Sequence, residues 1–578
     1  MPVSKFRPAA TLAIALLAAF PLRAQDATEA PYSGDSGAFL AARVAEANND
    51  LRASARWFGQ AIVADESNAR LLSGSIYANL GLGEFDLAYD GAKRVQALKA
   101  DSQAAEFALL ARDAAAEDYQ GILAAHKAGR SLGSTLTDDL ITAWAEFGLG
   151  RMSEALAGFD KLAATPGLEA FGLYHKALAL AAAGDFEGAD KILSGEAAGP
   201  IAVLRSGVIA HVQILSQLER NPDALALLDR NFGPGPDPQL DDLRARLTAG
   251  EPLPFEAVRS ARDGMAEVFF TVASALRGET DDSFILIHTR IASYLRPDHI
   301  DSLLTTAALL ENMGQYDLAV EAYAQVAADN PAYHVAEVGR AQAMYDGGQT
   351  DAAFEVLRAL ARNRPTLVGV QAALADLLRR AEKCAEAIPA YDAALALVPD
   401  PGPEHWGLFF SRGTCEEQQK QWDKAEPDLR QALALNPGQP QVLNYLGYSL
   451  VDRGEKLPEA LSLIEQAVAA QPEAGYIIDS LAWAYYRLGR YDDALAPMEK
   501  ASLLEPVDPV VTDHLGDVYW AVGRKLEARF QWRRALSFDP QEKEATRIRR
   551  KLEVGLDVVL QDEGAPPLNP VDAAAVDN

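Results

Sequence analysis

The sequence predicts an all-α solenoid, a right-handed superhelix of stacked helical hairpins. Three observations support this: a 34-residue period, a fixed pattern of large and small side chains within each period, and a proline near the end of each unit. The two clearest copies are residues 475–508 and 509–542. Counting back from them gives eight units, at 266–299, 300–333, 334–367, 368–401, 406–439, 440–474, 475–508 and 509–542.

Each position of the unit has a physical role. Small residues such as Gly516 and Ala528 let the first helix of a unit, helix A, approach the second, helix B. Gly523 opens the turn between them, and Pro540 ends helix B. One hairpin cannot bury its apolar face alone, so neighbouring units must stack. In period and residue pattern the unit resembles the tetratricopeptide repeat.

The first half of the chain keeps the 34-residue period but matches the residue pattern at fewer positions. We therefore expect a lobe of degenerate repeats over 25–238. The clearer units carry glycine, a large residue and alanine at repeat positions 15, 17 and 20, as the first of them does with Gly83, Phe85 and Ala88. These clearer units are 69–102, 136–169 and 170–203, and weaker ones are expected at 35–68, 103–135 and 205–238.

Three further segments fit no repeat. Residues 239–265 contain Gly250, Pro252 and Pro254 and are expected to form an irregular joint between two lobes. Residues 543–560 are amphipathic and are expected to cap the last repeat as a helix. The acidic tail, 561–578, is rich in Pro, Ala and Asp and is expected to be disordered.

Residues 1–24 have the composition of a secretory signal peptide. A basic start with Lys5 and Arg7 precedes an uncharged apolar stretch, and Ala24 provides a small residue for cleavage. We therefore expect a protein exported to the periplasm of a Gram-negative bacterium. The first cysteine is Cys384, so no N-terminal lipid anchor is expected, and no later stretch suits a membrane span.

Composition and motifs argue against several functional classes. The net charge of −29 makes nucleic acid and anionic lipid poor partners for the chain as a whole. The eight histidines form no His-x-x-x-His pair, the two cysteines have no zinc-ligand spacing, and the sequence has no glycine loop that would hold phosphate. We therefore expect no catalytic residues, no cofactor and no metal.

The candidate site is the concave groove that helix A lines in this class of repeat. Aromatic rings beside carboxylates suit an extended peptide with apolar and basic side chains. Alternatively, the rings pack between helices and the acids form a solvated face. In the last three repeats the groove positions are Asn444, Tyr448, Asp452, Asp479, Trp483, Tyr486, Arg487, Asp513, Asp517 and Trp520.

Basic residues close the array and allow two interpretations. The cluster docks a negative surface, or it lines the solvent side of the cap. Its members are Arg524, Lys525, Arg529, Arg533, Arg534, Arg547, Arg549, Arg550 and Lys551.

The repeat register also brings the two cysteines near one another. Cys384 is at position 17 of its unit, where helix B starts, and Cys415 is at position 10 of the next unit, in helix A. Both positions lie toward the end of the stack where the turns between helices A and B gather. An oxidising compartment permits a disulfide across this junction, and two isolated buried thiols are the alternative.

The stretch 406–556 resembles a group of exported bacterial tetratricopeptide proteins. The resemblance rests on the motifs Leu443–Ser449, Asp479–Arg490, Asp513–Trp520 and Glu527–Trp532. Members of that group include outer-membrane lipoproteins that bring substrates such as cell-wall hydrolases to a periplasmic carboxyl-terminal processing protease. The resemblance implies an adaptor, although this chain departs from those members in having no lipidation cysteine.

Two functional classes therefore stay open. The first is a non-catalytic periplasmic scaffold or adaptor whose partners are envelope proteins or peptides. The second is an enzyme or a carbohydrate-binding cell-envelope protein with its site in the groove or in residues 239–265. The absence of acid, base and metal constellations favours the first class.

Overall fold

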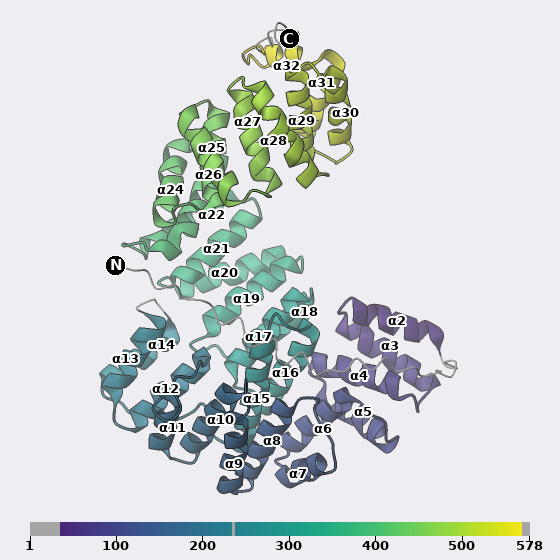
Figure 1. The fold of residues 1–578 in the computed structure, drawn as a ribbon, viewed down its shortest axis with the longest axis vertical. Coiled ribbons are helices and arrows are strands. Elements are labelled where there is room, and N and C mark those ends of the chain that lie inside the picture. Colours follow the sequence, from purple (N-terminus) through teal and green to yellow (C-terminus); the bar gives the residue numbers. More distant parts are fainter. Residues whose placement is uncertain (1–34, 234–236, 569–578) are drawn as a thin grey trace. The chain divides into compact units, whose positions relative to one another are not determined.

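The computed structural model describes residues 35–233 and 237–568, and within them every regular element is a helix (Figure 1). The expected signal peptide and the last ten residues of the expected tail lie outside this part of the chain. The chain divides into two compact units, unit 1 up to Arg364 and unit 2 from Pro365.

Unit 1 consists of consecutive antiparallel helix pairs. Most predicted repeats coincide with one pair each; the predicted unit 69–102, for example, holds α4 and α5. The helices of unit 1 are α2 (Ser36–Ala47), α3 (Leu51–Ala64), α4 (Ala69–Leu82), α5 (Phe85–Ala97), α6 (Gln103–Ala115), α7 (Tyr119–Lys127), α8 (Thr135–Gly148), α9 (Met152–Ala163), α10 (Glu169–Ala182), α11 (Phe186–Leu193), α12 (Arg205–Gln217), α13 (Asn221–Phe232), α14 (Pro238–Thr248), α15 (Ala261–Leu276), α16 (Asp282–Leu295), α17 (Ile300–Asn312), α18 (Tyr316–Tyr323), α19 (Tyr333–Asp346) and α20 (Thr350–Asn363).

Unit 2 continues the same pattern with five pairs and a C-terminal extension. The four-residue insertion at 402–405 contains a short 3-10 helix, η1 (Pro403–His405). The helices of unit 2 are α21 (Val368–Arg380), α22 (Cys384–Ala396), α23 (Trp406–Gln418), α24 (Trp422–Leu435), α25 (Pro440–Arg453), α26 (Leu457–Ala470), α27 (Gly475–Arg487), α28 (Tyr491–Leu504), α29 (Pro509–Ala521), α30 (Lys525–Leu536), α31 (Glu542–Val554) and α32 (Leu556–Asp562).

The turn between helices A and B requires one residue in the left-handed region. Gly489 and Gly523 take this place with φ angles of 75° and 85°. A side chain is rarely stable there, which explains the glycine in the repeat pattern. In the two repeats of unit 2 that lack it, Glu382 and Lys420 adopt the same conformation at φ 59° and 60°.

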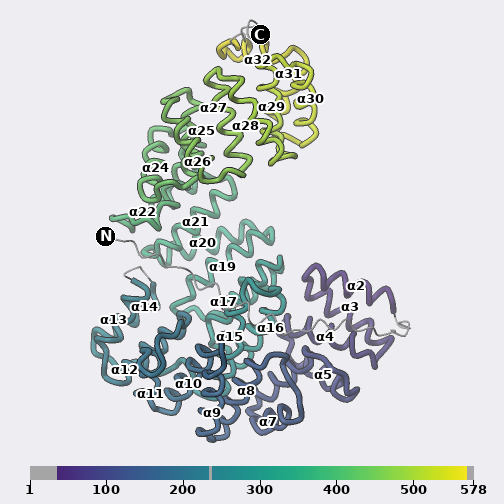
Figure 2. Tube along the Cα trace, in the orientation of Figure 1, coloured from purple at the N-terminus to yellow at the C-terminus, as the bar shows by residue number. Residues whose placement is uncertain are grey.

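The centre of unit 1 is the hairpin formed by α15 and α16, which we call the central hairpin. Its helices pack against α4, α6, α8 and α10, far earlier in the sequence. Figure 2 shows α15 and α16 near α4, α8 and α10. Every residue of α15 from Asp263 to Ala273 is buried. Such burial on all sides is typical of a helix enclosed by its neighbours rather than of an ordinary repeat at a solenoid surface.

Several close contacts fix the central hairpin in place. The ring of Tyr294 stacks on Phe85 with centroids 3.9 Å apart. Arg290 Nε donates a hydrogen bond to the carbonyl oxygen of Gly81 at 3.0 Å, and burial lowers the pKa of this arginine to about 10. Gly264 lies directly on the indole of Trp144. The hairpin therefore ties the early repeats of unit 1 together.

The structure revises the expected joint at 239–265. Helix α14 runs to Thr248 and α15 begins at Ala261, so only residues 249–260 are irregular. The division between the compact units falls at 364/365 instead. The prolines and glycine of this segment correctly indicated a break in the helices, but the chain turns inward here, into the core of unit 1.

The expected single capping helix at 543–560 is two helices. Helix α31 ends at Val554, and α32 begins after Gly555, whose φ is 87°. A Cβ atom at this position would lie 2.7 Å from the indole of Trp520, so glycine also permits a close approach. Helix α32 extends to Asp562, beyond the expected start of the tail.

No helix in the described residues combines the length and the apolar composition that a bilayer span requires.

The two cysteines are bonded in the structure. Cys384, at the start of α22, and Cys415, in α23, form a disulfide with their Cα atoms 4.9 Å apart. The bond joins helix B of one repeat to helix A of the next. Both residues are buried.

We predict that Gly264→Ala destabilises unit 1. The new methyl group would lie 2.3 Å from the ring of the fully buried Trp144, and overpacking of this kind costs about 1 to 3 kcal/mol. Gly59→Ala, in α3, is the matched control because its methyl group meets no atom within 4 Å and the change favours the helix by about 0.5 to 1 kcal/mol. Urea denaturation followed by circular dichroism measures both, and equal effects would contradict the packing described here.

We predict that the denatured, unreduced mature protein has no reactive thiol. Two reactive thiols per chain would refute the bond between Cys384 and Cys415. Changing both residues to serine should cost about 2 to 4 kcal/mol, because a disulfide restricts the unfolded chain. Ellman titration counts the thiols, and hydrogen exchange of α22 and α23 measures the loss of stability.

Candidate functional site

The predicted groove residues lie on one face of three successive A helices. Helix α25 carries three of them, α27 four and α29 three. We call this set the helix A face. The structure divides it into a covered part, which the protein's own C-terminal helices occupy, and an open part on α25 and α27.

The covered part is organised around a buried lysine. Lys551 of α31 is fully buried, and its Nζ lies 2.7 Å from Asp513 Oδ2 and 2.6 Å from Asp517 Oδ1. Asp517 also accepts a hydrogen bond from Trp532 Nε1 at 2.9 Å, and Arg547 approaches it to 3.4 Å. These carboxylates therefore hold the C-terminal helix and are not available to a partner in this structure.

Trp520 belongs to the same covered part. It is 7% exposed, its Nε1 donates to Asp557 Oδ2 at 2.9 Å, and its ring lies 5.2 Å from that of Trp532. The expectation that this ring faces a partner is not met, because α32 lies against it. The alternative, in which the ring packs between helices, describes Trp520 correctly.

Three stacked rings connect the covered and the open parts. Trp483 stacks on Tyr486 and on His514 with centroids 4.6 and 3.9 Å away and planes tilted by 12° in both pairs. His514 Nδ1 lies 3.0 Å from Asp479 Oδ1. Burial of the imidazole acts to lower the pKa of His514, but Asp479 with Asp513 and Asp517 outweighs it, so the pKa is raised.

The open part of the face consists of residues on α25 and α27. Asp452 and Arg487 are exposed and form an ion pair at 3.3 Å. Tyr448 is half-buried, and burial raises its pKa to about 12. Asn444 Oδ1 is buried without a hydrogen-bond partner among the described residues. With the half-buried edge of Trp483, these groups offer an aromatic and polar surface.

The C-terminal basic cluster is largely used within the chain. Arg547 pairs with Glu563 at 2.8 Å, and Arg550 pairs with Asp562 at 3.1 Å. Arg524 pairs with Glu499 at 2.9 Å. Together with the buried Lys551, these contacts favour a structural role in the cap for much of the cluster.

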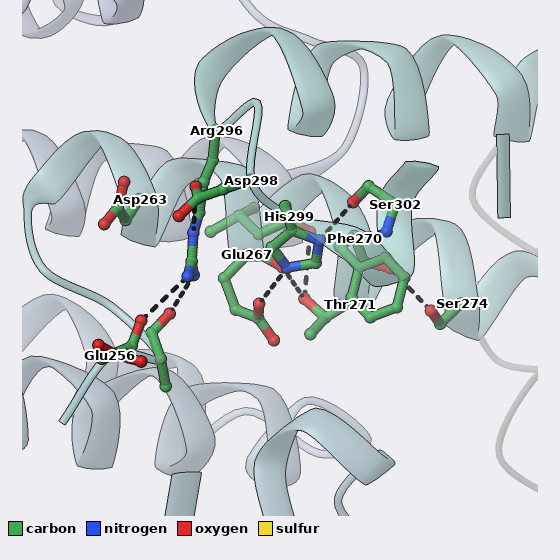
Figure 3. A network of polar contacts seen from close by, with 12 residues as sticks. Glu256, Asp263, Glu267, Phe270, Thr271, Ser274, Arg296, Asp298, His299 and Ser302 are labelled. Carbon is green, nitrogen blue, oxygen red and sulfur yellow. Dashed lines mark hydrogen bonds and ion pairs between the residues drawn. The ribbon is translucent and has the colours of Figure 1, made fainter. Parts of the chain in front are cut away.

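A second candidate site is a cavity of about 550 Å³ inside unit 1, which sequence reasoning missed. Its lining includes Glu267 and His299, which are 3% and 6% exposed. His299 Nε2 lies 3.0 Å from Glu267 Oε2, and Tyr174 donates its hydroxyl hydrogen to Glu267 Oε1 at 2.8 Å. Figure 3 shows His299 between Glu267 and Ser302.

Ser302, His299 and Glu267 contact one another in the same sequence as the serine, histidine and acid of a hydrolase triad. In this geometry, however, His299 is the N-cap of α17. His299 Nδ1 accepts hydrogen bonds from the backbone N–H of Ser302 at 3.2 Å and from its hydroxyl at 2.8 Å, at the start of α17. Ser302 is fully buried. A nucleophile must be reachable by substrate, so this arrangement does not support acyl transfer.

The sequence contains only one weak indication of this cavity. Glu267 is an acid within the otherwise apolar turn Met265–Phe270, where it has no local partner. Its partners His299 and Tyr174 are 32 and 93 residues away, so no short motif links them. Within the described residues, no group of three or more His, Cys, Asp or Glu side chains is arranged to hold a metal ion.

We predict that Lys551→Met strongly destabilises the end of unit 2. Removing one partner of a buried ion pair costs about 3 to 5 kcal/mol, because it leaves the carboxyl groups of Asp513 and Asp517 without their cation. Lys543→Met, on the exposed side of the same helix, should change stability by less than about 0.5 kcal/mol. Hydrogen exchange of α29 and α31 separates the two outcomes, and unchanged protection in the Lys551 variant would contradict the role of this lysine.

Comparison with known proteins supports the repeat assignment. The tetratricopeptide repeat family model matches residues 304–367, 372–440 and 445–506. A TPR repeat-containing protein of Pseudomonas aeruginosa is 37% identical over 92 residues, which are 16% of each chain. The human protein O-mannosyl-transferase TMTC1 is 28% identical over 175 residues, 30% of this chain and 20% of that protein. This chain thus spans a fifth or less of the length of these two curated relatives.

Solved structures with a similar helical arrangement include a chain of the APC/C hetero-tetramer Cut9–Hcn1. It is 15% identical, covers 90% of this chain and 96% of its own, and has a TM-score of 0.38. A tetratricopeptide repeat protein from Parabacteroides merdae is 17% identical, with coverages of 44% and 98% and a TM-score of 0.36. Residues 304–367, 372–440 and 445–506 thus match tetratricopeptide repeats, and the succession of helix pairs through the described residues forms an all-α solenoid.

Proposed function

We propose that the chain is a non-catalytic scaffold of the periplasm that binds envelope proteins or peptides through the open part of the helix A face. The observation that carries this proposal is the ring stack on Trp483, which lies beside the exposed Asp452 and Arg487. Tyr486 and His514 are only 7% and 9% exposed and hold Trp483 in place. The half-buried edge of Trp483 would supply apolar area to an extended peptide, and the exposed charges would fix its direction.

The finer proposal is an adaptor that delivers substrates such as cell-wall hydrolases to a periplasmic protease. It is supported by the resemblance of residues 406–556 to exported adaptors of this kind and by the composition of residues 1–24. Cell fractionation that finds the chain in the cytoplasm with Met1 retained would contradict the exported part of the proposal.

One observation favours the alternative class, an enzyme or a carbohydrate-binding protein with its site in residues 239–265. The cavity in unit 1 is lined in part by Glu256 and Ala257, which belong to the segment 239–265. Ser302 is fully buried and does not line this cavity, so a binding site is better supported there than acyl transfer by Ser302.

We predict that Asp452→Lys and Trp483→Ala each remove most partner binding. Loss of a central aromatic side chain from an interface typically costs about 2 kcal/mol or more, a roughly thirtyfold loss of affinity. Asp452 is exposed, so its reversal tests binding with little effect on folding. Immobilised mature protein presented with envelope extracts, with the captured proteins identified by mass spectrometry, measures the effect.

Two variants serve as controls for this capture experiment. Asp492→Lys reverses an exposed charge on α28, a B helix, and should leave the captured set unchanged. Trp520→Ala should chiefly lower stability, by about 3 to 5 kcal/mol, since its ring is core. An identical set of captured proteins for all four variants would refute the proposed binding face, and recovery of a carboxyl-terminal processing protease would support the adaptor.

A further inference from the structure

We propose that the unit 1 cavity binds an alkyl guanidinium or alkyl ammonium group, such as the side chain of arginine or lysine, with its cation beside Asp301 and Glu267. The inference rests on residues of unit 1 alone. It is independent of the partner-binding face on α25 and α27.

The size and walls of the cavity suit a cation on an aliphatic stem. A volume of about 550 Å³ lies in the range of small-ligand sites and exceeds that of one side chain. Its lining combines the apolar Ile209, Ile300, Leu304 and Val335 with acids. Long cationic side chains place their methylene groups along apolar surface and keep the charged end among polar groups.

The two arginines of the lining are already paired within the protein. Arg205 donates to Asp237 at 2.8 Å and to Gln239 at 3.1 Å. Arg296 donates to Asp298 and to the carbonyl oxygens of residues 256 and 257, as Figure 3 shows in part. Each guanidinium charge is thus already paired with a carboxylate of the chain, which makes an anion a poor occupant.

Asp301, in contrast, is an acid of the lining that no cation of the described residues contacts directly. The charged groups that face it, His299, Arg205 and Arg296 with Glu267, act on it from farther away than a hydrogen bond or a direct ion pair. Burial raises its pKa, which means that its charge is poorly solvated where it lies. A cation entering the cavity would stabilise that charge, and this gain appears as binding free energy.

Glu267 provides the second half of the cation site. Its two oxygens accept hydrogen bonds from Tyr174 and His299, which hold the carboxylate in one orientation. Burial acts to raise the pKa of Glu267, but His299, His175 and Tyr174 outweigh it, so the pKa is lowered. One fixed carboxylate and one unpaired carboxylate thus face the same space.

Isothermal titration calorimetry with the full mature chain tests the proposal. The probes are butylguanidinium and its neutral isostere butylurea, together with acetyl-Ala-Arg-Ala-amide and its citrulline counterpart. We expect each cation to bind at least tenfold more tightly than its neutral partner. Tighter binding of the tripeptide than of butylguanidinium identifies a peptide as the source of the cation, and equal binding identifies a free small molecule.

Asp301→Asn should reduce the preference for cations at least tenfold. Asp101→Asn, an exposed acid between α5 and α6, is the matched control and should change nothing. The wild-type chain gives an independent readout, because cation binding should weaken as the pH falls through the raised pKa of Asp301. Equal affinity for the charged and neutral probes, or an unchanged preference in a folded Asp301→Asn variant, would overturn the proposal.

Discussion

Unit 1 depends on the packing of the central hairpin against repeats that precede it by up to 209 residues. Arg290, buried on α16, bonds to Gly81 across 209 positions, and Tyr174 bonds to Glu267 across 93. In an ordinary solenoid each repeat contacts only its neighbours, so stability is nearly a sum of local terms. These long-range contacts give unit 1 a shared core, with the cooperativity of a globular domain.

Both units cover part of their inner surface with their own chain. In unit 1 the central hairpin packs among α4, α6, α8 and α10. In unit 2 the C-terminal helices occupy the last repeat, where Lys551 pairs with Asp513 and Asp517. What remains accessible on the helix A face is therefore a short stretch on α25 and α27, where the proposed partner would meet unit 2.

The sequence predicted local structure well and long-range structure poorly, for a physical reason. Helix pairs and their turns follow from residues within one period, such as the left-handed Gly489 and Gly523, and their limits agree with the structure to within a few residues. The buried partner of Asp513 lies 38 residues away, and no period connects the two. The sequence predicted which residues lie on the A helices α25, α27 and α29. It did not predict that α31 and α32 would cover those on α29, because the placement of these helices follows from contacts distant in the sequence.

The bond between Cys384 and Cys415 has a consequence for how unit 2 loses its structure. An array of stacked repeats frays from its ends, one hairpin after another, because each hairpin is held only by its neighbours. A covalent link between helix B of one hairpin and helix A of the next keeps both at high effective concentration after their contacts break. Fraying that reaches this junction is thus readily reversed, and a protease meets the linked hairpins as one piece even after the backbone between them is cut.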